Sequence, residues 1–325
     1  MTRPGRPALA AICVAVLVTL LGAWNISHLR WADRPWEVTQ AQLAAGENPY
    51  TLNLRSRATT LDQTGWPYGP ASLIALIPVY RAAVAVSGGD PRPAGFPWAC
   101  GALALLAHLM LMREAWRLSG RGPRGVVAVL AVGANPFLIR LDGEGDVLDL
   151  PMLWLLLAAV RTEEEGAWRR SGLALGLSLA IKQAGLLYLP VWLWRHRREP
   201  FGLVVLGLAL ALPAAPFLVW DPAAFGLAMT GAASAYRNFV QLDWWNQFAR
   251  QLQAGVPAQA LRVVSGVLTA AVVATVAVVA PRRPLRPLAA LTLVMGCAWV
   301  TYYSAYSLYL GWWTVIASVL VVASL

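Results

Sequence analysis

The chain has 325 residues, of which 58% are hydrophobic and 13% charged, and its net charge is +10 at pH 7. Soluble domains carry about a quarter of charged residues, so this composition excludes a soluble enzyme and indicates a polytopic membrane protein. In a soluble chain the positive charge would point to nucleic acid. Here the arginines stand in short clusters between apolar runs, where they set membrane topology, and no nucleic-acid partner is expected.

Apolar segments follow one another along the chain, at residues 8–28, 70–87, 96–112, 125–141, 147–160, 172–194, 201–220, 260–280, 287–305 and 308–325. Basic clusters separate them and mark the cytoplasmic side: Arg3 and Arg6; Arg113, Arg117, Arg121 and Arg124; Arg161, Arg169 and Arg170; Arg195, Arg197 and Arg198; and Arg282, Arg283 and Arg286. All clusters fall on one side if eight segments cross the membrane fully and two do not.

The two segments that do not cross are 70–87 and 172–194. We expect 70–87 to be an outer-face juxtamembrane or re-entrant helix, since a full crossing would move the next arginine cluster outside. Segment 172–194 has basic residues at both flanks and room for one crossing only, which favours a hairpin of two half-helices. Broken helices are tolerated only where they are buried in protein or line a wet cavity.

The sequence therefore predicts an all-α, multi-pass protein of the cell membrane, with residues 1–325 forming one transmembrane domain and both termini in the cytoplasm. About eight full spans are expected, together with the juxtamembrane or re-entrant helix and the broken-helix hairpin. Two long extracytoplasmic loops are predicted, at 29–69, which includes juxtamembrane helices, and at 221–258.

The first outer loop begins with acidic residues beside the membrane, in "WADRPWEVTQ" at 31–40. Asp33 and Glu37 are four residues apart and share one face of a helix if the chain is helical after Pro35. Either these carboxylates are solvated and pair with Arg30 and Arg34, or Asp33 is a catalytic base at the membrane surface. Both interpretations stay open from the residues alone.

A second acidic group lies in "RLDGEGDVLD" at 140–149, in a loop that is also expected outside. Its glycines favour a tight turn that brings Glu144 and Asp146 toward the first loop. The alternating acids resemble a calcium loop only superficially, because the closing glutamate and the helix pair of such a loop are missing. We expect no resident metal, with a divalent ion as the alternative.

Lys182 in "LAIKQAG" is the only lysine in the chain and lies near the middle of the broken segment. An ionised side chain at that depth needs a charged partner or a water-filled cavity. The alternative is that the amine reaches an interface along its own stem, but about 18 Å of helix lies on either side, which is beyond that reach. We therefore expect a functional role.

These features resemble, in their order, the GT-C glycosyltransferases, and most closely the bacterial polyprenyl-phosphate-mannose-dependent mannosyltransferases. The resemblance covers about the first 200 residues. It rests on a first helix, Asp33 ahead of "GENPY" at 46–50, "WPYGP" at 66–70, "NPF" at 135–137, the acidic loop, and "GLALGLSLAIKQAGLLYLP" at 172–190. The family usually has an aromatic residue four positions after the acid, and this chain has Glu37 there.

The resemblance implies a GT-C-like fold and a glycosyltransferase that moves mannose, or a similar hexose or pentose, from a polyprenyl-phosphate donor to a lipid-linked or cell-envelope glycan acceptor with inversion. Its partners are these two substrates and the membrane lipids. In this interpretation Asp33 is the base, with support from Glu37, Glu144 and Asp146. The donor phosphate is bound by Lys182, Arg55, Arg57 and Arg237. A transporter or lipid flippase and a noncatalytic assembly subunit are the alternatives.

Overall fold

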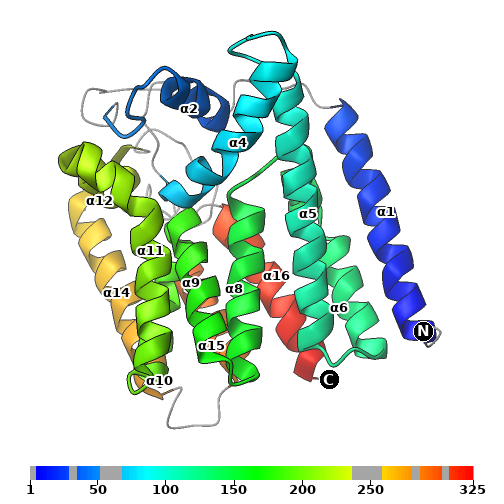
Figure 1. The fold of residues 1–325 in the computed structure, drawn as a ribbon. Coiled ribbons are helices and arrows are strands. Elements are labelled where there is room, and N and C mark those ends of the chain that lie inside the picture. The colour runs from blue at the N-terminus through cyan, green and yellow to red at the C-terminus, as the bar shows by residue number, and fades with distance from the viewer. Residues whose placement is uncertain are drawn as a thin grey trace.

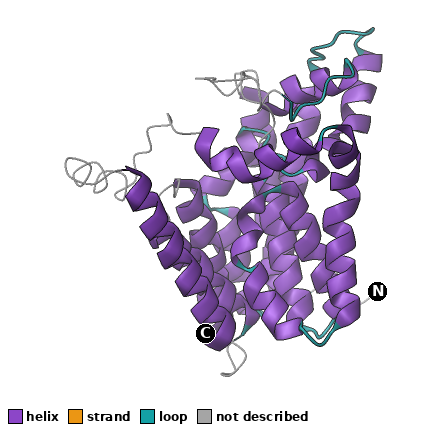
Figure 2. Cartoon of the chain, turned by 90° about the vertical axis from the view of Figure 1, so that its left-hand side faces the viewer, coloured by secondary structure: helices purple, strands orange, loops and turns teal. Residues whose placement is uncertain are grey.

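A computed structural model gives the fold and describes residues 5–28, 35–51, 68–235, 258–279, 286–301 and 307–324. Within these ranges every regular element is a helix, and no strand occurs (Figure 2). The predicted all-α class is therefore confirmed for this part of the chain.

The helices form a bundle in which the longer ones run between its two ends (Figure 1). In chain order the described elements are α1 (Arg6–His28), α2 (Pro35–Ala44), α4 (Pro70–Val86), α5 (Gly95–Leu118), α6 (Pro123–Gly133), α7 (Pro136–Gly143), α8 (Asp149–Glu164), α9 (Trp168–Ile181), the 3-10 helix η1 (Gln183–Leu187), α10 (Leu189–His196), α11 (Pro200–Trp220), α12 (Pro222–Ala235), α14 (Ala258–Val279), α15 (Pro287–Thr301) and α16 (Ser307–Ser324). Helices α6 and α7 follow each other across a short break.

Several helices have the length and composition of membrane spans. Among the described residues three helices, α1, α5 and α11, are long and apolar enough to cross a membrane, and a fourth span results if α6 and α7 are counted as one. Helices α4 and α15, and the apolar parts of α14 and α16, are shorter. The protein is thus a helical membrane protein, while the total of eight full crossings stays a prediction.

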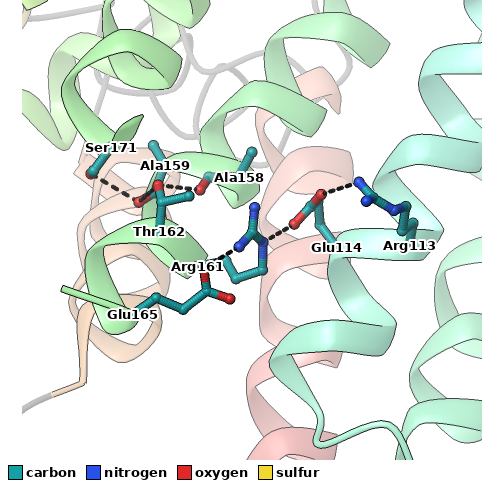
Figure 3. A network of polar contacts seen from close by, with 8 residues as sticks. All are labelled: Arg113, Glu114, Ala158, Ala159, Arg161, Thr162, Glu165 and Ser171. Carbon is teal, nitrogen blue, oxygen red and sulfur yellow. Dashed lines mark hydrogen bonds and ion pairs between the residues drawn. The ribbon is translucent and has the colours of Figure 1, made fainter. Parts of the chain in front are cut away.

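Charged residues join several helix ends at one end of the bundle, which we call the basic end. Arg161 near the end of α8 donates a hydrogen bond to Glu114 of α5 (Figure 3). Arg286, ahead of α15, donates to Glu164 at 2.9 Å and to the carbonyl of Ala323 in α16 at 3.3 Å. The first turn of α1 and the last turn of α16 lie at this same end (Figure 1).

Segment 172–194 is broken, as the sequence predicts. Helix α9 ends at Ile181, and after η1 the chain returns through α10 to the end from which it came. The rings of Trp168 and His196 lie 4.5 Å apart, and the indole of Trp192 donates to the hydroxyl of Ser171 at 2.8 Å. The two arms therefore meet at the basic end and form a hairpin.

A buried carboxylate fastens the second arm of the hairpin to α8. Glu163 receives the Tyr188 hydroxyl at 2.7 Å, and it lies 2.9 Å from Arg195 Nε and 3.0 Å from His196 Nε2. A buried charge is tolerated only when it is paired and hydrogen-bonded, and Glu163 has partners of both kinds. The arms of the hairpin are consequently fixed at their open end.

The first arm packs against α11 through glycines of the "GLALG" stretch. A methyl group added at Gly172 would lie 2.5 Å from the carbonyl oxygen of Gly202, and one at Gly176 would lie 2.6 Å from the Cβ of Ala209. Small residues four apart let two backbones approach closely, which is a common way to pack helices in membranes. This contact holds the hairpin against a long apolar helix.

Helices α2 and α4 lie toward the end of the bundle opposite the basic end (Figure 1). The amide of Gln40 in α2 donates to the carbonyl of Leu73 in α4 at 2.8 Å, so the two helices are fixed to each other. Segment 70–87 forms one short apolar helix, and the expectation that it does not cross fully stays a prediction.

Candidate functional site

The centre of the candidate site is an ion pair at the tip of the hairpin. Lys182 follows the last residue of α9 in an extended conformation, and its amine donates to Asp149 at 2.5 Å. The two side chains are only 11% and 3% exposed. Asp149 is the first residue of α8, where the helix dipole favours a negative charge. Lys182 therefore has a charged partner inside the protein. Such a partner is expected from the sequence, because Lys182 lies near the middle of an apolar segment.

Two aromatic rings also lie beside the amine. The rings of Tyr68 and Trp312 each have their centres 5.0 Å from Lys182 Nζ. Ring faces attract a cation by their quadrupole, and the attraction is stronger where water is excluded. We call Lys182, Asp149, Tyr68 and Trp312 the Lys182 site.

The "WPYGP" motif lies directly against the hairpin tip. The backbone N–H of Gly69 donates to the carbonyl of Ile181 at 3.0 Å. A Cβ at this glycine would lie 2.0 Å from the carbonyl oxygen of Ala180, so no other residue fits without moving backbone. The absence of a side chain at Gly69 is what lets the start of α4 reach the residue before Lys182.

The "GENPY" motif is joined to the same place. Tyr50 is fully buried, its N–H donates to the Asn48 side chain at 3.0 Å, and its hydroxyl donates to the carbonyl of Tyr68 at 3.0 Å. Its ring also packs edge-on against Phe217 and Phe225, with 5.0 Å between the centres in each pair. The structure thus brings "GENPY", "WPYGP" and "LAIKQAG" together around the Lys182 site.

The two acids predicted in the second loop have different places. Asp146 is buried beside the site and its carboxylate accepts from the N–H groups of Leu148 at 2.8 Å and Asp149 at 2.6 Å, so it caps the start of α8. Glu144 pairs with Arg140 at 2.8 Å on an exposed surface. The loop and Lys182 therefore converge, but through Asp149 and not through Glu144.

The other predicted site residues are only partly placed. Asp33, Arg55, Arg57 and Arg237 lie outside the described residues. For Glu37 the structure describes only the backbone, in the first turn of α2.

A cavity of about 320 Å³ opens beside α2. One face of α2 lines it together with residues 91–97, and its polar side chains are Gln42, Glu47 and Arg92. Tyr80 and Phe96 are buried at its wall and pack edge-on at 5.2 Å. Carboxylate, amide, guanidinium and aromatic groups together are suited to a ligand rich in hydroxyl groups. Asp33 precedes α2 by two residues in the chain.

Sequence reasoning missed several residues of this region. It did not identify Asp149 as the partner of Lys182, nor Tyr68 and Trp312 as its aromatic walls. It also passed over His108, although an ionisable residue in the middle of an apolar 24-residue helix is itself a signal.

In the described part of the chain no three His, Cys, Asp or Glu side chains are grouped for a metal. The expectation of no resident metal stays a prediction.

Comparison with known proteins identifies no family for the chain. No protein family model matches the chain, and no curated protein matches its sequence.

Proposed function

We propose that the chain is a membrane-embedded glycosyltransferase that uses a polyprenyl-phosphate sugar as its donor. The observation that carries the proposal is the Lys182 site: a buried amine at the tip of a broken helix, beside aromatic rings and at the foot of the first outer segment. Such a site holds a fixed cation where a lipid-linked phosphate enters from the bilayer. A fixed cation in a partly dehydrated site acts strongly on developing negative charge.

In this proposal the basic end faces the cytoplasm, because arginine-rich loops are retained there. Both termini are then cytoplasmic, eight segments cross fully, and residues 29–69 and 221–258 are outside. Helices α2 and α4 become juxtamembrane helices of the outer face, and the hairpin of α9 and α10 is re-entrant from the cytoplasmic side. The polyprenyl chain stays in lipid while its phosphate and sugar reach the Lys182 site.

The chemistry is an inverting displacement. The acceptor hydroxyl oxygen bonds to the anomeric carbon while the bond from this carbon to the phosphate oxygen breaks, and that electron pair leaves with the phosphate. The hydroxyl proton passes to the carboxylate of Asp33 acting as general base. Lys182 has three N–H donors, so it can bind a phosphate oxygen while it keeps Asp149. Arg55, Arg57 and Arg237 are the proposed further cations.

The remaining residues take supporting places. Asp146 acts by capping α8 and so fixing Asp149, which makes it a positioning residue. Glu37 lies on α2, four residues after the expected base in the sequence. The cavity lined by Gln42, Glu47 and Arg92 is the proposed approach of a lipid-linked or cell-envelope glycan acceptor. The transfer proposed is of mannose or a similar hexose or pentose.

One observation favours a second candidate. A buried ion pair at the break of a membrane helix is also typical of secondary transporters, where broken helices bind the moving ion or solute near the midplane. A transporter or lipid flippase would open this site alternately to both faces. A glycosyltransferase needs access from the outer face only.

The test is transfer by membranes that contain the protein, supplied with radiolabelled polyprenyl-phosphate mannose, glucose or arabinose. We expect labelled glycan or glycolipid with one donor, and a fall of about a hundredfold to ten-thousandfold for Asp33→Asn, which keeps the size of the side chain but not its basicity. Arg140→Gln, on the exposed surface, is the matched control and should transfer normally. Absence of transfer with all donors, or full activity of Asp33→Asn, would overturn the proposal.

A further inference from the structure

A second buried polar pair lies apart from the Lys182 site. His108 is in the middle of α5 and is fully buried, and Asp142, in the last turn of α7, is 1% exposed. His108 Nδ1 and Asp142 Oδ2 lie 2.6 Å apart. None of the proposed chemistry uses these groups, although they are buried between helices of the bundle. A buried ionisable pair needs a reason to be there.

Both ring nitrogens of His108 face oxygen atoms. Nδ1 faces Asp142, and Nε2 lies 3.3 Å from the carbonyl oxygen of Val132. A carbonyl only accepts, so Nε2 carries a proton. The second proton lies between Nδ1 and the carboxyl group, on one atom or the other. In either arrangement the pair as a whole is neutral, which suits its burial.

The contact with Val132 lies where the backbone is interrupted. In a continuous helix the carbonyl of Val132 would receive the N–H four residues later, but that residue is Pro136, which has none. Helices α6 and α7 are bent by 53° at this point. The carbonyl of Val132 accepts instead from the N–H of Asn135 at 3.2 Å, and His108 adds a second donor while it also binds the last turn of α7.

The last turn of α7 holds the loop that leads to the Lys182 site. The carbonyl of Leu141 accepts from the N–H of Asp146 at 3.0 Å, and the carbonyl of Asp142 accepts from that of Gly145 at 3.0 Å. Asp146 in turn accepts from the N–H of Asp149, the partner of Lys182. A continuous series of hydrogen bonds thus runs from His108 in α5 to Lys182 at the hairpin tip.

We propose that His108 and Asp142 are positioning residues for the Lys182 site. By joining α5 to both sides of the α6–α7 break, they fix the loop at 144–148 and hence the position of Asp149. The effect on sugar transfer rests on the proposed function, whereas the effect on the loop does not. Small displacements of groups around a reacting centre cost about a hundredfold in rate, so the pair acts on turnover without touching substrate.

The experiment measures the loop and the reaction separately. Spin labels on Asp90→Cys and Glu144→Cys, with the three native cysteines replaced by serine, report the distance from the outer α4–α5 turn to the loop. The variants are Asp142→Ala, His108→Phe and Asp142→Asn. The last is the conservative control, because its amide can donate to Nδ1 while Nε2–H keeps its contact with Val132. Transfer from the labelled donor is measured per folded molecule, as kcat and KM.

We expect Asp142→Ala and His108→Phe to broaden or shift the distance distribution and to lower kcat/KM about tenfold to a hundredfold. Asp142→Asn should restore a narrow distribution and most of the activity. A residue that only stabilises the fold would lower the yield and leave kcat, KM and the distance unchanged, and that result would overturn the inference. Equal defects in Asp142→Asn and Asp142→Ala would also overturn it.

A double variant keeps the test usable if the single variants fail to fold. His108→Phe with Asp142→Leu leaves no buried polar side chain unpaired, so the protein should fold, yet it cuts the link to the loop. The distance should shift in this variant, and an unchanged distance would count against the inference. If the distance shifts but the wild-type protein transfers no sugar, the positioning role stands and the proposed glycosyltransferase does not.

Discussion

The basic end and the Lys182 site both contain buried charges, but they satisfy them differently. Glu163 at the basic end has a tyrosine hydroxyl, an arginine and a histidine around it, from α10 and the residue before it. The contacts of Lys182 include one carboxylate and the faces of two aromatic rings. A ring face holds a cation more weakly than an oxygen atom does, so a phosphate can replace it. In the proposed function the Lys182 site accepts the donor phosphate, whereas the basic end keeps its contacts.

The largest effect is expected from a change at the Lys182 site. Lys182→Met removes the cation and should lower transfer from the polyprenyl-phosphate donor about a hundredfold to a thousandfold, in the range for loss of one donor to developing charge. Lys182→Arg keeps the charge and should lose about ten times less. Donor binding and turnover measured on both variants check this. Equal activity of the methionine variant would remove Lys182 from the site.

A nearly equal effect should follow from a change next to the site. Gly69→Ala places a methyl group against the backbone of Ala180, so α4 must move away from the hairpin tip. We expect transfer to fall about a hundredfold, as for other displacements of catalytic groups. Gly207→Ala in α11 is the matched control, because nothing lies within 4 Å of the added group. Similar activity in the two variants would show that the contact at Gly69 has no functional weight.

A change at the basic end should lower the stability of the protein and leave sugar transfer unchanged. Glu163→Ala leaves Arg195 and His196 without their carboxylate, and removal of one partner from a buried ion pair costs about 3–5 kcal/mol. Thermal unfolding in detergent should show a lower midpoint. Transfer per folded molecule should stay at the wild-type level. A fall in kcat with unchanged stability would mean that the basic end takes part in the reaction.

The smallest effect should come from the exposed pair. Arg140→Gln breaks the contact with Glu144, and exposed pairs four residues apart contribute about 0.3–0.5 kcal/mol. We expect no measurable change in transfer and a shift of the unfolding midpoint near the limit of detection. A large loss of activity would return Glu144 to the site, where the sequence interpretation places it.

The sequence predicts the parts of this arrangement that depend on composition and order. The helical class and the broken segment around Lys182 follow from hydropathy and from arginines at both flanks, which act over one segment at a time. Asp149 was not predicted as the partner of Lys182, because the pair joins residues 33 positions apart and has no pattern along the chain. Trp312 was not predicted as a wall of the site for the same reason.

The acidic loop shows a different limit of sequence reasoning. Spacing alone treats Glu144 and Asp146 as equivalent members of an alternating acidic group. The structure separates them, because Asp146 stands just before a helix start and caps it, whereas Glu144 follows the end of α7 and faces Arg140. If the sequence showed that α8 begins at Asp149, Asp146 could have been recognised as its cap. The apolar pattern places the start of this helix near residue 147 and does not determine its first residue.

The hairpin of α9 and α10 also bears on biogenesis. Its tip combines interrupted backbone with a charged amine, and neither is stable in lipid alone. The hairpin can settle only after α8 supplies Asp149, and its glycine face needs α11, which is synthesised later. We therefore expect the ribosome to have completed α11 before the segment leaves the translocation machinery. A chain truncated after residue 199 should leave this segment accessible from the cytoplasm.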